Sequence, residues 1–202
     1  MTKSNDSVSV IIPAFNEEFA IVETLKEIYE VLSANFDNFE IIVVNDGSSD
    51  NTGKAAGINK DIQILNHKEN RGYGASLKTG IKRSKYDLLV IIDADGQYPA
   101  DVIPEMVSQI SNFDMIIGSR TGVSVKIPIL RRPAKWFIKK LAEYVTSSDI
   151  KDLNSGLRCF RKSTALSYLH LLPDKFSFTT TLTVALLSDG LEIGYVEINY
   201  AE

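Results

Sequence analysis

Two acidic residues stand close together in the motif Asp93-Ala94-Asp95-Gly96-Gln97, directly after the apolar run Asp87–Ile92. That run has the length and the branched residues of a strand buried on both faces, so the acids fall where a strand ends. Carboxylates at the carboxyl end of such a strand can hold a hard divalent cation, which in turn can bind phosphate. Asp93 and Asp95 could instead cap the next helix and form a turn with Gly96. The pentapeptide alone leaves both interpretations open.

Similar polar sets follow three other apolar runs, at residues 13–17, 45–48 and 118–120. In a parallel sheet all four strand ends meet at one edge, and this convergence is harder to dismiss than any single motif. Acids of the first two sets could accept hydrogen bonds from a base and a ribose. Arg120 in the last set could add a two-point contact to phosphate. Together the four sets favour a binding site.

The elements that must position these motifs alternate along the chain. Strands are expected at Val8–Ile12, Glu40–Val44, Ile62–Leu65, Asp87–Ile92 and Asp114–Gly118, with a closing strand at Glu192–Tyr200. Helices are expected after Glu18 (with Ile21, Leu25, Ile28 and Leu32 on one stripe), at Ala75–Ser84, Asp101–Ser111, Ser163–Leu172 and Thr180–Ser188. This alternation predicts the α/β class, with a Rossmann-like, mainly parallel sheet that carries helices on both faces.

Composition limits the possible classes of protein. A chain of 202 residues suits one domain, and a net charge of -4 offers no global basic field for nucleic acid. The single cysteine excludes an internal disulfide framework and suits a reducing compartment. There is no signal-peptide core at residues 1–7 and no apolar stretch of membrane-spanning length. Because the chain stops at Glu202, just after a predicted strand, we expect the natural protein to continue.

Residues 126–140 combine six basic residues and no acid with apolar and aromatic ones. A basic amphipathic helix of this kind is how a peripheral protein meets anionic lipid headgroups. It could equally be a surface helix whose apolar stripe packs on the sheet. With the first interpretation we expect a cytoplasmic protein, peripheral to the membrane or tethered by residues beyond this chain.

Other common nucleotide and hydrolase sites fit poorly. The chain has no G-x-x-x-x-G-K-[ST] loop and no G-x-S-x-G motif, and Gly72-Tyr73-Gly74 lacks the third glycine of a dinucleotide site. With only two histidines, His67 and His170, a catalytic triad or a histidine-rich metal site is not expected.

The ordered motifs resemble those of family 2 glycosyltransferases, in the branch of dolichol-phosphate mannose synthases and polyprenyl-phosphate glycosyltransferases. The motifs that carry the resemblance are residues 10–18, 44–52, 70–75, 93–97 and 118–120. The resemblance covers nearly the whole chain and implies one GT-A domain over residues 1–202. Residues 1–120 would bind a GDP- or UDP-linked sugar with Mg²⁺ or Mn²⁺, and residues 121–202 would bind the acceptor.

The same resemblance assigns roles to individual residues. Asp93, Asp95 and Gln97 would hold the metal and the donor diphosphate, with Asp95 catalytic. The remaining nucleotide-sugar contacts would be Pro13, Ala14, Asn16, Glu17, Asp46, Ala94 and Arg120. The family often has two acids in the second motif where this chain has Asn45-Asp46, so the base of the donor stays open.

The second half of the chain points to the acceptor. Residues 152–161 are similar to the branch's segment ending in S-G-x-R, whose arginine, here Arg158, would be catalytic and face the acceptor phosphate. Ser155 and one of Arg131 or Arg132 would complete this acceptor site. The chain lacks the Q-x-x-R-W element of processive polysaccharide synthases, which disfavours polymer synthesis.

The expected reaction is an inverting transfer of the sugar to a polyprenyl phosphate, which is nucleophilic enough to need no strong base. A hydroxyl acceptor is the alternative and would require a base such as Asp149 or Asp152. A non-catalytic subunit that binds nucleotide sugars is a further alternative.

Overall fold

The computed structural model describes residues 3–120, 140–146 and 148–200 of the chain. Arg131, Arg132 and all of the basic segment except Lys140 lie outside these residues. In the part of the chain that is described, no helix is long and apolar enough to cross a membrane.

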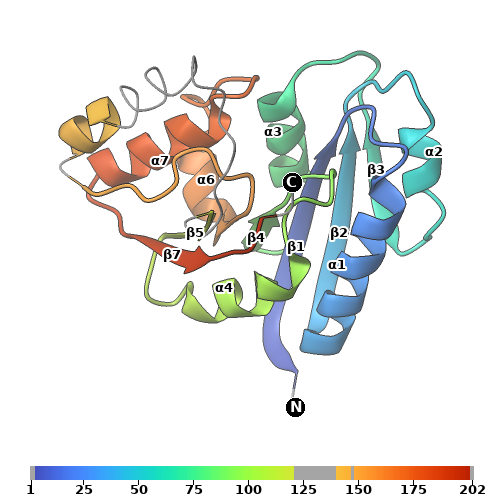
Figure 1. Ribbon diagram of the computed structural model, residues 1–202, viewed down its shortest axis with the longest axis horizontal. Coiled ribbons are helices and arrows are strands. Elements are labelled where there is room, and N and C mark those ends of the chain that lie inside the picture. Colours follow the sequence, from blue (N-terminus) through green and yellow to red (C-terminus); the bar gives the residue numbers. More distant parts are fainter. Residues whose placement is uncertain (1–2, 121–139, 147, 201–202) are drawn as a thin grey trace.

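The core of the protein is a seven-stranded sheet (Figure 1). Its strands lie in the order β3-β2-β1-β4-β6-β5-β7. Their bounds are β1 Ser4–Ala14, β2 Phe36–Asn45, β3 Ile62–Asn66, β4 Leu88–Ile91, β5 Met115–Ser119, β6 Arg158–Arg161 and β7 Ile193–Glu197. All neighbouring strands are parallel except β6, which runs antiparallel to both β4 and β5. The predicted mainly parallel sheet is therefore confirmed, while β6 had not been expected to be a strand.

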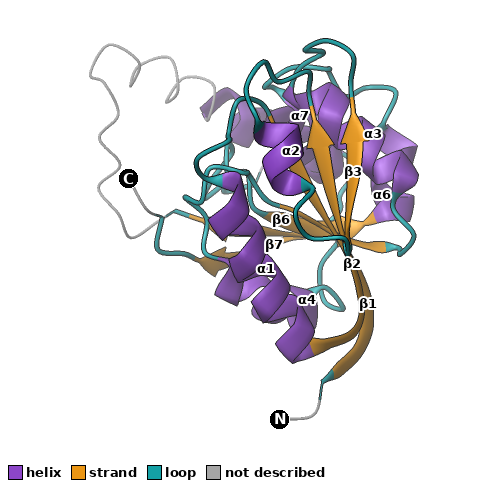
Figure 2. Cartoon of the chain, turned by 90° about the vertical axis from the view of Figure 1, so that its right-hand side faces the viewer, coloured by secondary structure: helices purple, strands orange, loops and turns teal. Residues whose placement is uncertain are grey.

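Helices cover both faces of the sheet, as predicted. Their bounds are α1 Ile21–Asn35, α2 Thr52–Ala56, α3 Tyr73–Arg83, α4 Ile103–Gln109 (preceded by a 3-10 turn at Ala100–Val102), α6 Lys162–Tyr168 and α7 Phe178–Ser188. Residues 140–146 are also helical. Figure 2 shows α1 and α4 on one side of the sheet, with α3 and α6 on the other. The four residues of the predicted α1 stripe are all buried, so the helix docks through the face that its sequence periodicity indicated.

Two apolar clusters hold these layers together. One joins α1 and α4 to the sheet and includes Leu25, Ile28 and Met106. The other joins α3, α6 and α7 to the opposite face and includes Leu77 and Leu182. Side chains of the central strands alternate between the two clusters, which is why these strands are apolar throughout.

The register of the central strands sets the position of the polar motifs. Ala14 of β1 pairs with Asn45 of β2, and Ile11 of β1 pairs with Ile91 of β4. The chain therefore leaves β1, β2 and β4 at nearly the same level. This brings the first three polar motifs to one edge of the sheet, as the parallel arrangement predicts.

Candidate active site

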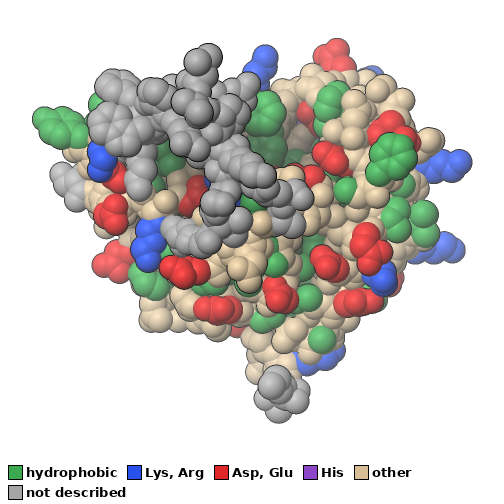
Figure 3. Space-filling view, viewed as in Figure 1, with side chains coloured by type: hydrophobic (Ala, Val, Ile, Leu, Met, Phe, Trp, Pro, Cys, Tyr) green, Lys and Arg blue, Asp and Glu red, His purple; other side chains and the backbone are tan. Residues whose placement is uncertain are grey.

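A pocket of about 450 Å³ opens at this edge of the sheet. Seven residues predicted to bind the nucleotide sugar line it: Pro13, Ala14, Glu17, Asp46, Asp93, Ala94 and Asp95. The second half of the chain adds Asn154, Gly156, Phe176 and Thr179 to the lining. Asn16, Gln97 and Arg120, which were also predicted to contact the nucleotide sugar, are not among the lining residues. Figure 3 shows a hollow near the upper edge of one face, with acidic side chains close to it.

The charged side chains among the described residues that line the pocket are all acidic. Four carboxylates line it, at Glu17, Asp46, Asp93 and Asp95, and none of the described lining residues is a lysine or an arginine. An anionic ligand such as a diphosphate would meet repulsion here unless a cation came with it. This charge pattern favours a site in which a metal ion mediates the contact with phosphate.

Asp93 and Asp95, in the motif that follows β4, are both partly buried. Burial, reinforced by the charge of Asp95, raises the pKa of Asp93 to about 6. One of its oxygens, Oδ1, accepts a hydrogen bond of 2.9 Å from the Tyr73 hydroxyl. Burial and then the charge of Asp95 also raise the pKa of Glu17. Burial and the charge of Asp95 therefore disfavour the ionised forms of Asp93 and Glu17, a cost that a bound cation would offset.

The donor set fits a hard divalent cation in part. Asp93 and Asp95 supply two carboxylates, and Mg²⁺ is commonly held by one or two carboxylates together with substrate phosphates. No group of three or more His, Cys, Asp or Glu side chains within the described ranges is arranged to hold a metal alone. The Gln97 amide oxygen accepts a hydrogen bond from the Tyr200 hydroxyl. A carbonyl oxygen has two acceptor positions, so this hydrogen bond leaves one for a metal ion.

Asp46 is held by three donors at the end of β2. Its Oδ1 lies 2.6 Å from His67 Nδ1 and 3.0 Å from the Arg71 backbone nitrogen, and its Oδ2 lies 2.7 Å from the Gly72 backbone nitrogen. His67 Nε2 in turn lies 2.9 Å from Thr79 Oγ1 in α3. Asp46 thus ties the loop before α3 to the end of β2 while one side of it faces the pocket.

Asn16 has a structural position beside the pocket. It adopts a left-handed backbone conformation with φ of 58°, which asparagine tolerates better than most residues. Its side-chain oxygen accepts a hydrogen bond of 2.9 Å from the Ser49 backbone, and the next backbone nitrogen, that of Glu17, donates to Thr52 Oγ1 at 2.7 Å. Asn16 therefore locks the loop after β1 onto the loop after β2, and this turns Glu17 toward the pocket.

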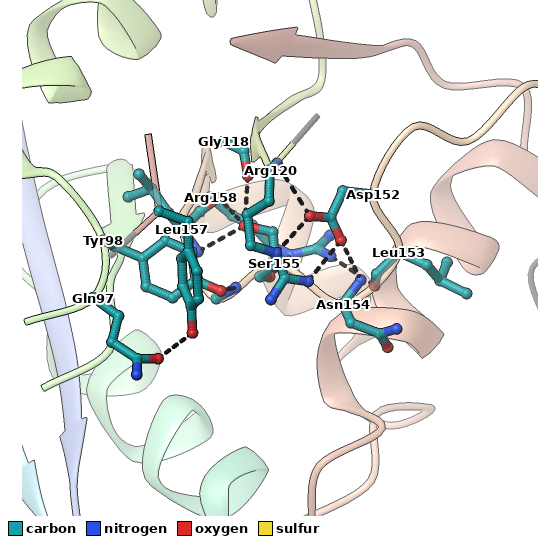
Figure 4. A network of polar contacts seen from close by, with 12 residues as sticks. Gln97, Tyr98, Gly118, Arg120, Asp152, Leu153, Asn154, Ser155, Leu157 and Arg158 are labelled. Carbon is teal, nitrogen blue, oxygen red and sulfur yellow. Dashed lines mark hydrogen bonds and ion pairs between the residues drawn. The ribbon is translucent and has the colours of Figure 1, made fainter. Parts of the chain in front are cut away.

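Arg120 forms an ion pair with the carboxylate of Asp152. Its Nε and Nη2 donate to Asp152 Oδ2 and Oδ1 at 2.7 and 2.9 Å (Figure 4). Burial alone would raise the pKa of Asp152, but the hydrogen bonds and charge of Arg120 hold it below its ordinary value. Arg120 therefore already makes a two-point contact with Asp152, and its contact with the donor phosphate stays a prediction.

Arg158 and Ser155, which were predicted to contact the acceptor, lie in the interior. Both have no exposed surface. Arg158 donates to the backbone oxygens of Ser155 and Leu153 at 2.9 and 3.0 Å (Figure 4). It also donates to Thr183 Oγ1 at 2.6 Å. Burial lowers the pKa of Arg158 to about 10. Ser155 Oγ donates to the Gly118 oxygen at 2.6 Å. Neither side chain has a free face for a ligand, and both instead stabilise the segment around β6.

Two residues near the acids were missed by the sequence reasoning. Tyr73 supports Asp93, and its ring stacks on Phe176 with centroids 6.2 Å apart and an interplanar angle of 12°. Gly156 lies so close to Asp93 that a Cβ there would be 2.2 Å from Asp93 Oδ2. Both belong to motifs that carried the resemblance, so their position in those motifs was the available signal. Their contacts with Asp93 depend on strands that meet only in the folded chain.

Comparisons with known proteins agree with this geometry. The profile described as "Glycosyl transferase family 2" matches residues 9–168. An uncharacterized protein of Methanocaldococcus jannaschii is 30% identical over 204 residues, which cover 96% of this chain and 82% of that protein. The dolichol-phosphate mannosyltransferase of Pyrococcus furiosus is 33% identical over 168 residues, which cover 77% of this chain. The matched part spans only 46% of that mannosyltransferase.

Among solved structures, the fold is similar to the crystal structure of glucosyl-3-phosphoglycerate synthase from Mycobacterium tuberculosis in complex with Mn²⁺, uridine-diphosphate and phosphoglyceric acid. The TM-score is 0.75 at 19% identity, and the match covers 98% of this chain and 71% of that chain. This likeness confirms the predicted GT-A fold.

Proposed function

The chain belongs to glycosyl transferase family 2, and we propose that it transfers a sugar from a nucleotide-diphosphate sugar to a polyprenyl phosphate. The name of the Pyrococcus furiosus relative, a dolichol-phosphate mannosyltransferase, supports an acceptor of this class. The donor would lie against the residues contributed by β1, β2 and β4. The acceptor would approach from the side of Asn154, Phe176 and Thr179.

The observation that carries this proposal is the distribution of acids around the pocket. All four carboxylates among the described lining residues come from the loops after β1, β2 and β4. The lining residues of the second half, counted without residues 121–139, which the structure does not describe, have no acidic or basic side chain. A hydroxyl acceptor would need a base near its oxygen. A phosphate monoester has its second pKa at about 6, so near pH 7 it is mostly a dianion and needs no such base.

The two acids that could have served a hydroxyl acceptor are not placed to do so. Asp152 is ion-paired with Arg120, which lowers its pKa and occupies both of its oxygens. Asp149 is exposed and is not among the residues that line the pocket. The geometry therefore favours a phosphate over a hydroxyl as the nucleophile.

Asp93 and Asp95 are the residues that would hold a divalent ion, Mg²⁺ or Mn²⁺, with Gln97 as a further ligand. When bound, the ion would neutralise the diphosphate leaving group. Glu17 and Asp46 would position the nucleoside, and Tyr73 would keep Asp93 oriented. Displacement would occur in line at the anomeric carbon, with inversion. Most of the catalysis would then come from positioning and charge neutralisation.

The acceptor lipid implies a position at a membrane surface. Residues 126–140, including Arg131 and Arg132, supply basic and aromatic side chains suited to anionic headgroups and to the acceptor phosphate. We therefore place the protein at the cytoplasmic surface of a membrane, as a peripheral protein or as one tethered by residues outside this sequence.

A matched pair of acceptors tests the proposal. The purified protein would be incubated with a panel of GDP- and UDP-sugars, Mn²⁺ or Mg²⁺, and either a polyprenyl phosphate or the polyprenol of the same chain length. We expect glycosylated lipid only with the phosphate, and its loss in the Asp95→Asn variant. Comparable transfer to the polyprenol would support a hydroxyl acceptor. Binding of the donor without turnover on either acceptor would indicate a non-catalytic nucleotide-sugar-binding subunit.

A further inference from the structure

The Asp46 carboxylate has a limited capacity to bind a ligand. An ionised carboxylate can only accept hydrogen bonds and has about four acceptor positions, two on each oxygen. On Oδ1, both positions are taken by His67 Nδ1 at 2.6 Å and the Arg71 backbone nitrogen at 3.0 Å. On Oδ2, one is taken by the Gly72 backbone nitrogen at 2.7 Å. One acceptor position therefore remains, on Oδ2.

His67 is the side chain that occupies the second acceptor position of Asp46 Oδ1. The Arg71 and Gly72 contacts come from the backbone, whereas the third comes from a side chain at the end of β3. The side chains of His67 and Asp46 are only 6% and 4% exposed. Thr79 Oγ1, at 2.9 Å from Nε2, fixes the ring from the other side. Solvent has little access to this contact, so His67 keeps Oδ1 occupied whatever ligand enters the pocket.

A single remaining acceptor distinguishes between bases. Uracil and thymine present one ring N–H between two carbonyl oxygens, so one acceptor satisfies them. Guanine presents two adjacent donors, a ring N–H and an amino group, which a carboxylate satisfies only with both oxygens. Cytosine and adenine place a ring nitrogen acceptor beside the amino group, which would face the carboxylate unfavourably. An unmatched donor or acceptor in a buried site weakens binding.

From this geometry we infer that His67 is a specificity-determining residue that restricts the pocket to uracil or thymine nucleotides by occupying Asp46 Oδ1. The inference rests on the proposed function, since it assumes that Asp46 faces the base of the donor. It adds the base class of the donor, which the sequence motifs leave open. Without His67, Oδ1 would regain a free position, and Asp46 could face the two donors of guanine.

Nucleotide binding by the unaltered protein is the first test. Isothermal titration calorimetry with UDP, GDP and N3-methyl-UDP, each in the presence of Mn²⁺, measures the base preference without any acceptor lipid. We expect UDP to bind about tenfold or more tightly than GDP or N3-methyl-UDP, since each of the latter leaves a mismatch at Asp46. N3-methyl-UDP differs from UDP only at the proposed contact. Equal binding of these two would overturn the inference.

Two variants of His67 then test its role. Asparagine places an amide nitrogen near the position of Nδ1, so His67→Asn should keep the preference for UDP over GDP. Leucine removes the donor, so His67→Leu should reduce the UDP-to-GDP affinity ratio several-fold toward one. A merely structural role would weaken both nucleotides equally and leave the ratio unchanged. An unchanged ratio in a folded His67→Leu protein would therefore overturn the inference.

The outcomes also separate this inference from the proposed function. Tighter binding of GDP than of UDP to the unaltered protein would overturn the base assignment alone, because transfer to a polyprenyl phosphate needs no particular base. Binding of neither nucleotide with Mn²⁺ present would overturn the base assignment together with the proposed function. If the leucine variant does not fold, the comparison of UDP with N3-methyl-UDP on the unaltered protein still decides the question.

Discussion

Arg120 and Asp152 form a two-point ion pair, with Nε–Oδ2 and Nη2–Oδ1 distances of 2.7 and 2.9 Å. The pair joins the residue after β5 to the segment that precedes β6. In this ion pair Arg120, which could have bound phosphate, and Asp152, which could have served as a base, neutralise each other. This single contact therefore shifts the expected chemistry toward a metal-assisted reaction with a phosphate nucleophile.

Removal of the Asp152 side chain should lower the stability of the protein and leave kcat nearly unchanged. Asp152→Ala leaves the partly buried Arg120 without its partner, and we expect a loss of about 2–3 kcal/mol in the free energy of unfolding. The kcat of the folded fraction should change less than threefold. Urea denaturation and initial-rate measurements on polyprenyl phosphate check this. Asp149→Asn, at an exposed position, is the control and should change neither quantity. A large loss of kcat in a stable Asp152 variant would point to a catalytic base.

Substitution of Arg158 should act through folding. Arg158→Ala removes a fully buried side chain and leaves the Leu153 and Ser155 oxygens without their donors. We expect a loss of about 3–5 kcal/mol, with donor binding and transfer falling together as the protein unfolds. Arg158→Met, which refills much of the volume, should lose less. A variant with the Tm of the unaltered protein but a raised KM for the acceptor would restore the predicted acceptor role.

The raised pKa of Asp93 predicts a pH dependence for the metal-free protein. Burial moves this pKa from its ordinary value of 3.8 to about 6, so between these values the folded state binds the proton more tightly than the unfolded state. The contribution of Asp93 to stability should therefore fall as pH rises from about 4 to about 6, by on the order of 3 kcal/mol. Asp93→Asn should remove this fall, because it removes the charge that burial disfavours.

Urea denaturation of both proteins at several pH values, with a chelator present, measures this difference directly. The Asp93→Asn protein should be the more stable of the two above pH 6 and should gain nothing when Mn²⁺ is added. The unaltered protein should regain stability with Mn²⁺, since binding to the folded state alone raises its stability. Parallel stability curves for the two proteins would contradict the assignment of a buried, destabilised carboxylate at Asp93.

Gly156→Ala should displace Asp93. A Cβ at this position would lie 2.2 Å from Asp93 Oδ2, so the carboxylate must move, and its contact with Tyr73 would be disturbed. We expect kcat to fall about 10²-fold, as displacements near 1 Å in catalytic groups do, and the affinity for Mn²⁺ to fall with it. Gly57→Ala is a suitable control, because its new Cβ would lie 3.3 Å from the end of the Ile64 side chain and at ordinary contact distances of 3.5 and 3.6 Å from two backbone oxygens. Normal Mn²⁺ affinity in the Gly156 variant would show that Asp93 does not hold the ion.

Much of the fold and of the donor side could be predicted from local sequence. Branched apolar runs indicate buried strands whatever their neighbours are, and the spacing of Ile21, Leu25 and Ile28 fixes the buried face of α1. Because parallel strands end at one edge, the position of Asp46, Asp93 and Asp95 in one pocket follows from the order of elements alone.

The acceptor side depended on contacts that sequence does not display. Arg158 looked like a free cation, yet Thr183 and two backbone oxygens enclose it, because β6 enters the sheet antiparallel between β4 and β5. Asp152 looked like a possible base, yet Arg120, 32 residues earlier, holds it.

The sequence by itself determined most of the order of strands and helices, with β6 and α2 as exceptions, and the acidic edge of the sheet, since hydrophobic periodicity and residue type are local properties. Only the tertiary structure decided which charged groups are paired or buried, as Arg120, Asp152 and Arg158 are. An ionisable side chain is buried or exposed, paired or available, according to partners distant in the chain. His67 shows the same principle, because its contact with Asp46 exists only once β2, β3 and α3 have come together.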